Sequence, residues 1–312
     1  MPPQRSPRLV KPRALQPGGT LGIAAPAGPV DPRVLQAGVA VLRGAGFQVV
    51  HREDIGDREG YLAGSDARRA SELQELWSDD RVDAILCARG GYGCQRILDA
   101  LDPQLAREAR KPLVGYSDIT ALLLWQRRCA GLVGFHGPML DYGDELPGES
   151  LEALLAQLQG QSRPPLQLRG RGLVPGSARG RLAGGNLSLV TASLGTSWEI
   201  STRGAILVIE EVGERPYRID RMLEQLRSAG KFDGLRGIAV GGLRDCKDPR
   251  YPEPDALQVI ERAACRARVA CVADLPFGHQ PANHPWAQGV RATIDGEKGE
   301  VRILEQGVMR AT

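Results

Sequence analysis

Short apolar runs alternate with helical patterns through the first 125 residues, and this alternation constrains the fold more than any other feature. The apolar runs that indicate buried strands are Leu21–Ala25, Phe47–Val50, Val82–Cys87 and Leu113–Tyr116. Asp31 followed by Pro32, and later Ser65, are typical signals for the beginning of a helix. Strands that alternate with helices at this spacing predict βαβ units and a mostly parallel sheet.

The chain is long enough for two domains, because its 312 residues exceed the common domain size of about 100–150 residues. Residues 161–179 are polar, rich in Gly and Pro and without periodicity, so we predict a linker there. The fold class expected is α/β, with a Rossmann- or flavodoxin-like domain in residues 1–160. Residues 180–312 predict a second, mixed α/β domain.

Composition and charge exclude several classes of protein. The chain is 42% hydrophobic and 25% charged, and its net charge of +3 comes from scattered basic residues. We therefore expect no nucleic-acid partner. The N-terminus has no apolar core of a signal peptide, and no later run reaches the roughly 18 apolar residues of a membrane span. A cytoplasmic protein without membrane contact is expected, and six cysteines without a Cys-x-x-Cys pair indicate reduced thiols rather than a zinc site.

Ser117 stands between an apolar run and a helical segment, where an α/β fold can present a nucleophile. A serine at such a position is more often a helix cap, and Ile119 replaces the last glycine of Gly-x-Ser-x-Gly. A nucleophilic serine also needs a base and a group that orients the base. His279 lies in a Pro- and Gly-rich loop, and Glu210 and Glu211 end an apolar strand. Adjacent strand residues point to opposite faces, so only one of the two acids can face His279, and we expect the other to be solvated or salt-bridged.

The glycine loop Arg89-Gly-Gly-Tyr-Gly93 permits three interpretations. It is a tight turn, a phosphate cradle or a loop whose backbone N–H groups a substrate can approach. The phosphate interpretation is weak, because the loop lacks the Lys-Ser/Thr of a P-loop and the spacing of Gly-x-Gly-x-x-Gly. The third interpretation makes the N–H of Gly91 an oxyanion donor, together with the N–H of Asp118.

Five motifs in order resemble the LD-carboxypeptidases, a family of serine peptidases. They are Arg89-Gly-Gly-Tyr-Gly93, Gly115-Tyr-Ser117-Asp, Gly184-Gly-Asn186-Leu, the run from Ile209-Glu210-Glu211 to Asp220-Arg-Met-Leu, and Pro276-Phe-Gly-His279. The resemblance extends from about Leu21 to about Val301. The chain departs from the family's usual pattern at Glu211, where aspartate is common, so either acid could orient the histidine, and we take Glu210.

The resemblance implies roles for individual residues. It implies a triad of Ser117, Glu210 and His279. Our own further expectation is that Arg89, Gly90, Tyr92 and Asn186 contact the substrate. The resemblance also implies hydrolysis, without metal or cofactor, of the bond between the L-centre of meso-diaminopimelate and the terminal D-alanine of murein tetrapeptides. A homodimer, and a site formed where the two domains meet, are further expectations. His136 is expected to be structural or to line the substrate site.

Two other functions remain open from the sequence. One is the cleavage of microcin C-type antibiotics by a self-immunity enzyme of the same family, which would favour an aromatic wall for a nucleobase. Aromatic residues make up only 4% of the chain, although Trp125, Trp198 and Trp286 could serve. The other is a non-catalytic α/β protein that binds a sugar or peptide, in which Ser117 and His279 only form hydrogen bonds to the ligand.

Overall fold

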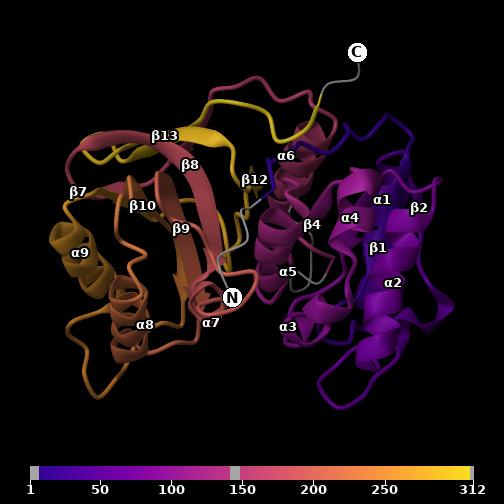
Figure 1. The fold of residues 1–312 in the computed structure, drawn as a ribbon, viewed down its shortest axis with the longest axis horizontal. Coiled ribbons are helices and arrows are strands. Elements are labelled where there is room, and N and C mark those ends of the chain that lie inside the picture. Colours follow the sequence, from indigo (N-terminus) through magenta and orange to yellow (C-terminus); the bar gives the residue numbers. More distant parts are fainter. Residues whose placement is uncertain (1–6, 141–147, 310–312) are drawn as a thin grey trace. The chain divides into compact units, whose positions relative to one another are not determined.

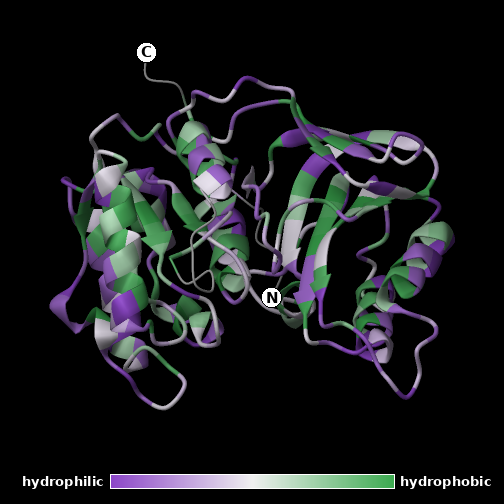
Figure 2. Ribbon diagram, turned by 180° about the vertical axis from the view of Figure 1, so that it is seen from behind, coloured by the Kyte–Doolittle hydropathy of each residue, from purple (hydrophilic) through white to green (hydrophobic). Residues whose placement is uncertain are grey.

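The protein has an α/β fold that divides into two compact units, as the computed structural model of residues 7–140 and 148–309 describes (Figure 1). Unit 1 comprises Met1–Ser162, Pro285–Ala287 and Gly307–Thr312, and unit 2 comprises Arg163–His284 and Gln288–Gln306. Each unit contains one sheet. The strands of the unit 1 sheet are largely hydrophobic, whereas several strands of unit 2 and the helices carry both hydrophobic and hydrophilic stretches (Figure 2).

The sheet of unit 1 has six strands in the order β12-β5-β4-β3-β1-β2. Five are parallel, and β12 is antiparallel to β5. Their bounds are β1 Thr20–Ala24, β2 Gln48–Val50, β3 Ala84–Cys87, β4 Leu113–Gly115, β5 Phe135–His136 and β12 Trp286–Ala287. The mostly parallel sheet expected from the alternating pattern is therefore confirmed.

Helices α1 and α2 of unit 1 begin at the capping residues seen in the sequence. The side chain of Asp31 accepts a hydrogen bond at the start of α1, and Ser65 caps α2 in the same way. The bounds are α1 Pro32–Gly44, α2 Asp66–Ser78, α3 Cys94–Ile97, α4 Pro103–Ala109, α5 Ile119–Trp125 and α6 Gly148–Leu158. The strand order reverses between β2 and β3, so right-handed crossovers place α1 and α2 on opposite faces of the sheet. Such a reversal opens a crevice beyond the carboxyl ends of β1 and β3.

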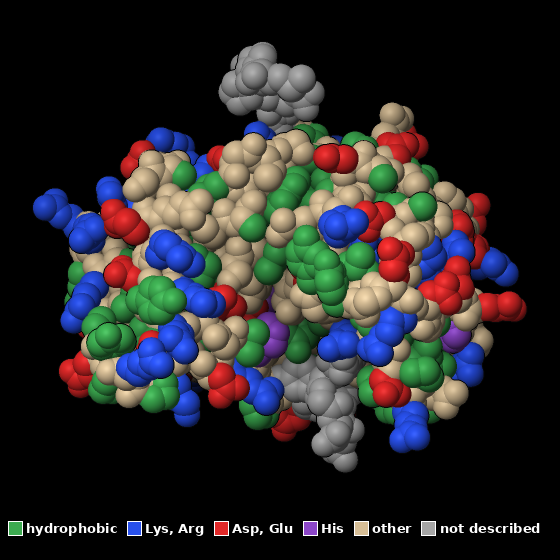
Figure 3. Space-filling view, turned by 90° about the horizontal axis from the view of Figure 1, so that it is seen from below, with side chains coloured by type: hydrophobic (Ala, Val, Ile, Leu, Met, Phe, Trp, Pro, Cys, Tyr) green, Lys and Arg blue, Asp and Glu red, His purple; other side chains and the backbone are tan. Residues whose placement is uncertain are grey.

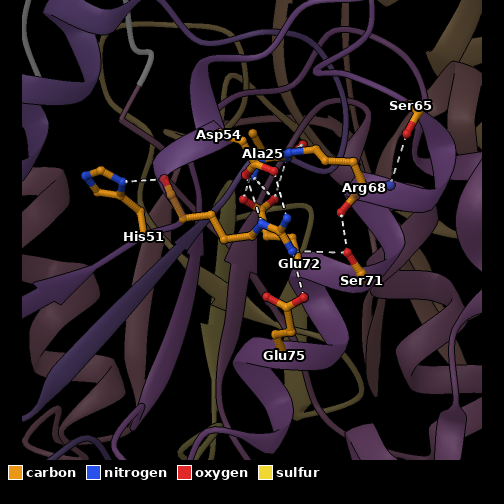
Figure 4. Close-up of polar contacts among 9 residues, drawn as sticks. Ala25, His51, Asp54, Ser65, Arg68, Ser71, Glu72 and Glu75 are labelled. Carbon is orange, nitrogen blue, oxygen red and sulfur yellow. Dashed lines mark hydrogen bonds and ion pairs between the residues drawn. The ribbon is translucent and has the colours of Figure 1, made fainter.

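A buried polar network ties the end of β1 to α2 (Figure 4). Glu72 is completely buried, and its carboxylate accepts hydrogen bonds from the backbone N–H of Ala25 at 2.7 Å and from Arg68 at 2.8 Å. Burial raises the pKa of Glu72, and the Arg68 guanidinium opposes that shift. Arg68 also contacts Asp54, which holds the chain before α2 against the helix. The network fixes the position from which the loop after β1 departs.

The sheet of unit 2 has eight strands in the order β6-β14-β13-β8-β9-β10-β11-β7. Strands β8 to β11 are parallel, and the other four pair antiparallel. The bounds are β6 Leu166–Arg169, β7 Arg171–Val174, β8 Ser177–Asn186, β9 Ala205–Val212, β10 Gly237–Arg244, β11 Ala270–Ala273, β13 Arg291–Asp295 and β14 Glu300–Ile303. The helices are α7 Leu187–Ala192, α8 Pro216–Ser228 and α9 Ala256–Ala267.

The two edges of this sheet are joined by one residue, because β6 and β7 are opposite edge strands separated only by Gly170. The sheet must therefore curl until its edges meet. The N–H of Gly170 donates to the carbonyl of Gly299 at 2.8 Å, and a Cβ at residue 170 would lie 2.0 Å from the carbonyl oxygen of Ala273. Only glycine fits at this junction.

Two segments differ from the sequence expectations. Residues 161–179, expected as a linker, contain β6, β7 and the start of β8. These strands are short and rich in Arg and Gly, so they carry little apolar periodicity. Residues 285–287 return to unit 1, where Trp286 is buried and stacks on His136 with ring centroids 5.0 Å apart. A two-residue strand gives no recognisable sequence pattern.

Candidate functional site

Ser117 follows β4 directly and has an unusual backbone conformation. Its φ is +60°, in the left-handed region that residues other than glycine rarely adopt. The helix α5 begins two residues later, with Asp118 at its N-cap position. A sharp strand-to-helix turn with a strained serine is the geometry that exposes a nucleophilic hydroxyl in α/β hydrolases. The conformation costs about 1–3 kcal/mol, which such sites retain where it serves the chemistry.

The glycine loop lies against this turn. A Cβ added to Gly90 would lie 2.9 Å from the Cβ of Ser117 and 3.0 Å from its Oγ. Gly90 therefore leaves the space beside the hydroxyl open, and a side chain at this position would fill it. Gly91 has a φ of +107°, so it too adopts a conformation that favours glycine.

Asp118 connects the serine turn to the glycine loop through its side chain. Its carboxylate is 2% exposed and accepts a hydrogen bond from the backbone N–H of Cys94 at 2.8 Å. Burial raises the pKa of Asp118, and the hydrogen bond from Cys94 opposes that shift. From the sequence, Asp118 is expected to cap the following helix or to act through its backbone N–H, and its side chain makes no capping hydrogen bond to α5. The side-chain role was missed because Cys94 lies 24 residues away, and no local pattern signals the contact.

In unit 2, Glu210 and His279 form a close pair. His279 Nδ1 lies 2.6 Å from Glu210 Oε2, and the backbone N–H of His279 donates to the same oxygen at 3.3 Å. Glu210 is completely buried at the end of β9, whereas the imidazole is 16% exposed. Gly278 allows this approach, since a Cβ there would lie 2.6 Å from the Cβ of Glu210. The contact directs Nδ1 toward the acid and puts Nε2 on the opposite side of the ring.

Glu211 points away from this pair and has a different environment. It accepts hydrogen bonds from Asn186 Nδ2 at 2.9 Å, from Ser188 N at 2.9 Å and Oγ at 2.7 Å, and from the N–H of Val212 at 2.9 Å. Burial raises the pKa of Glu211. The expectation that one acid of the pair is solvated or salt-bridged is wrong, because both are buried and Glu211 is held by neutral donors. Asn186, expected to bind substrate, binds Glu211 and caps α7.

Other residues singled out in the sequence occupy varied positions. Arg89 Nη1 donates to the carbonyl of Pro29 at 2.9 Å. Tyr92 is 45% exposed and makes an edge-to-face contact with Tyr61 at 5.7 Å. His136 is completely buried and stacked on Trp286, in agreement with a structural role.

On the face seen in Figure 3, Lys and Arg side chains lie interspersed with Asp and Glu. Among the described residues, no group of three or more His, Cys, Asp or Glu side chains is placed to hold a metal ion. The helices within residues 7–140 and 148–309 include none with the length and hydropathy to cross a bilayer.

The structure thus brings the proposed site residues together in two groups. Ser117, Gly90, Gly91 and Asp118 belong to unit 1, and Glu210 and His279 belong to unit 2. Each group lies at the carboxyl ends of parallel strands, where α/β proteins bind ligands.

Comparisons with known proteins agree with the motifs. The sequence profile of the LD-carboxypeptidase N-terminal domain matches residues 21–137, and that of the C-terminal domain matches residues 179–294. A probable murein peptide carboxypeptidase from Bacillus subtilis is 39% identical over 305 residues, which cover 96% of this chain and 95% of the relative.

Two solved structures share the fold. The crystal structure of muramoyltetrapeptide carboxypeptidase from Oxalobacter formigenes has a TM-score of 0.81 at 27% identity, over 92% of this chain and 99% of that chain. The structure of MccF in complex with glutamyl sulfamoyl guanosine has a TM-score of 0.86, over 96% of this chain and 99% of that chain. At 22% identity, the second likeness concerns the fold alone.

Proposed function

Because this chain belongs to the LD-carboxypeptidase family, we propose that it is a serine carboxypeptidase of murein peptides. Its substrate is a tetrapeptide, and the bond that it hydrolyses joins the L-centre of meso-diaminopimelate to the terminal D-alanine. The observation that carries this proposal is the 2.6 Å contact between His279 Nδ1 and the buried Glu210. A histidine held in this way is a base of defined tautomer, and Ser117 is the nucleophile that it would serve.

The proposed reaction has two halves. Ser117 Oγ attacks the carbonyl carbon while its proton passes to Nε2 of His279, and Glu210 accepts the Nδ1–H bond and stabilises the imidazolium. The backbone N–H groups of Gly91 and Asp118 donate to the oxyanion. The imidazolium then protonates the leaving amine, so the C–N bond breaks and D-alanine departs. Water attacks the acyl-serine with His279 as base, which releases the tripeptide and restores the hydroxyl.

A carboxypeptidase must also recognise the free carboxylate of D-alanine, and we propose Arg89 for this role. One guanidinium nitrogen of Arg89 is held by the carbonyl of Pro29, so the side chain is fixed beside the glycine loop. Arginine suits the task because its planar fork can bind a carboxylate through two hydrogen bonds.

Substitution of Arg89 by Glu is expected to raise KM for the tetrapeptide by about 10–100-fold. A loss of this size is expected because the variant would no longer form a hydrogen bond to the charged carboxylate of the substrate. The measurement is steady-state D-alanine release from the tetrapeptide and from its C-terminal amide. Wild-type protein should prefer the free carboxylate, and the variant should lose this preference. Unchanged KM and unchanged preference would remove Arg89 from the site.

Substitution of Gly90 by Ala is expected to lower kcat by about 10–100-fold, because a displaced nucleophile loses its alignment with the substrate and a shift of about 1 Å can cost about 100-fold. The added methyl would lie 3.0 Å from Ser117 Oγ and must displace it. Gly44→Ala is the matched control, since a Cβ there meets nothing within 4 Å. Equal kcat values for both variants would contradict the contact between the glycine loop and the nucleophile.

The microcin-type alternative has less support. An indole face for a nucleobase would have to be exposed, but Trp125, Trp198 and Trp286 are 3%, 5% and 0% exposed. Incubation with murein tetrapeptide and, separately, with an aminoacyl sulfamoyl nucleoside distinguishes the two activities. Faster cleavage of the nucleoside would favour the alternative, and cleavage of neither would favour the non-catalytic binding protein.

A further inference from the structure

Arg69 is a buried cation that binds two loops as well as Asp66 of its own helix. The residue belongs to α2 and is completely buried. Its Nη1 donates to the carbonyl of Pro26, after β1, at 2.7 Å and to the carbonyl of Gly93, after β3, at 2.8 Å. Its Nη2 donates to Asp66. One guanidinium therefore joins the two loops that border the crevice at the strand-order reversal.

The glycine loop needs such an anchor because glycine restricts its own backbone least. Gly91 and Gly93 have φ values of +107° and +135°. The packing around Gly93 is tight, since a Cβ there would lie 2.7 Å from Arg69 Nη1. Two further bonds hold the loop from the side of β1, namely from the N–H of Gly28 to the carbonyl of Gly90 and from Arg89 to Pro29.

The peptide unit between Gly93 and Cys94 is held at both ends. Its carbonyl accepts the bond from Arg69, and its N–H donates to the carboxylate of Asp118. Asp118 is the residue after Ser117, so this single peptide plane links α2, the glycine loop and the nucleophile turn. Rotation of the plane would break both bonds.

Stability alone does not account for Arg69. Burying a guanidinium carries a desolvation penalty, and apolar residues of similar size often stabilise a core equally well. The acid beside it does not depend on Arg69, because Asp66 also binds Arg96 at 2.8 Å. The neighbouring Arg68 has a separate role in the network with Glu72 and Asp54 (Figure 4).

We propose that Arg69 is a positioning residue, which holds the carbonyl of Gly93 and so fixes one end of the glycine loop, while the bond from the N–H of Gly28 to the carbonyl of Gly90 orients the peptide that carries the N–H of Gly91. This inference rests on the proposed hydrolase function and adds a residue to it. Arg69 touches no reacting atom. Its effect is to keep the oxyanion donor of the glycine loop in register with Ser117.

The test compares Arg69→Met with Arg96→Met. Arg69→Met should lower kcat by about 10–100-fold and change KM by less than about 2-fold. The reason is that a misplaced oxyanion donor stabilises the transition state less but leaves substrate binding unchanged. Arg69→Lys should recover part of kcat. Arg96→Met removes the other cation bound to Asp66 but leaves the bond from Arg69 to the glycine loop in place, so its kcat should match wild type. An equal fall in both variants, unchanged kcat in Arg69→Met, or a rise in KM alone overturns the proposal.

Amide hydrogen exchange gives a readout that is independent of activity. Arg69→Met should speed exchange in residues 90–94, and Arg96→Met should not. Unchanged exchange in residues 90–94 would contradict the positioning role of Arg69. This outcome is separate from the hydrolase function, which would be refuted if the wild type released no D-alanine. If Arg69→Met does not fold, Arg69→Lys and the rescue of Arg69→Ala by added guanidinium replace it. If Arg69→Ala folds and added guanidinium does not raise its kcat, the positioning role of Arg69 is contradicted.

Discussion

Replacement of Ser117 by alanine is expected to abolish release of D-alanine, with kcat lowered by about 10⁴-fold or more, as when other serine peptidases lose their nucleophile. The substitution removes one oxygen and keeps the Cβ, so the packing against Gly90 is retained. Thermal unfolding should therefore change little. The measurement is D-alanine released from murein tetrapeptide, quantified with D-amino acid oxidase, beside a melting curve for each protein.

Two results would contradict the proposed chemistry. Equal release by wild type and Ser117→Ala would remove the serine from the reaction. Release by neither would favour a binding protein. Binding of tetrapeptide to Ser117→Ala, measured by calorimetry, then shows whether the variant still recognises the substrate that it cannot cleave.

Replacement of Glu210 by glutamine is expected to lower kcat by about 10³–10⁴-fold, because an amide can donate to Nδ1 and so favour the wrong tautomer of the histidine. Nε2 would then carry a proton and could not accept one from Ser117. KM should change little, since the buried acid has no proposed contact with substrate. The measurement is kcat and KM across pH for wild type and variant.

The neighbouring Glu211→Gln is the matched control for Glu210→Gln. Glu211 accepts four hydrogen bonds from Asn186, Ser188 and Val212. The NH₂ group of glutamine is a donor and would lie opposite these donors, so some of the four bonds would be lost. We expect a lower melting temperature and a kcat within a few-fold of wild type. The reverse result, with the larger loss of kcat in Glu211→Gln, would transfer the orienting role to Glu211.

The fold of unit 1 could be predicted from local signals. Asp31 and Ser65 mark helix starts through hydrogen bonds to residues two or three positions away, so the sequence contains the whole interaction. Pro32 marks the first turn of α1 through its fixed φ. The edge strands β6 and β7 gave no such signal. Their pairing partners are β14 and β11, and what makes them strands is that distant pairing.

The candidate site was predictable where a motif marks it and not where long-range contacts form it. Ser117, Glu210 and His279 came from motifs, and the direction of Glu210 toward His279 agrees with strand alternation. The burial of both acids could not be foreseen, because strand alternation predicts opposite faces but not what covers each face. The bonds of Arg69 and Asp118 to the glycine loop join residues 24 positions apart.

The junction at Gly170 has a consequence for how the polypeptide is made. Strand β7 leaves the ribosome long before its partner β11, which lies about 100 residues later in the chain. The delay between β6 and its partner β14 is longer still. At about 5–20 residues per second, these partners emerge roughly 5–30 s after the strands that need them. Arg169 and Arg171, which flank the junction, keep the waiting segment charged and so discourage it from pairing with another nascent chain. Unit 2 can complete its sheet only after β14 has emerged.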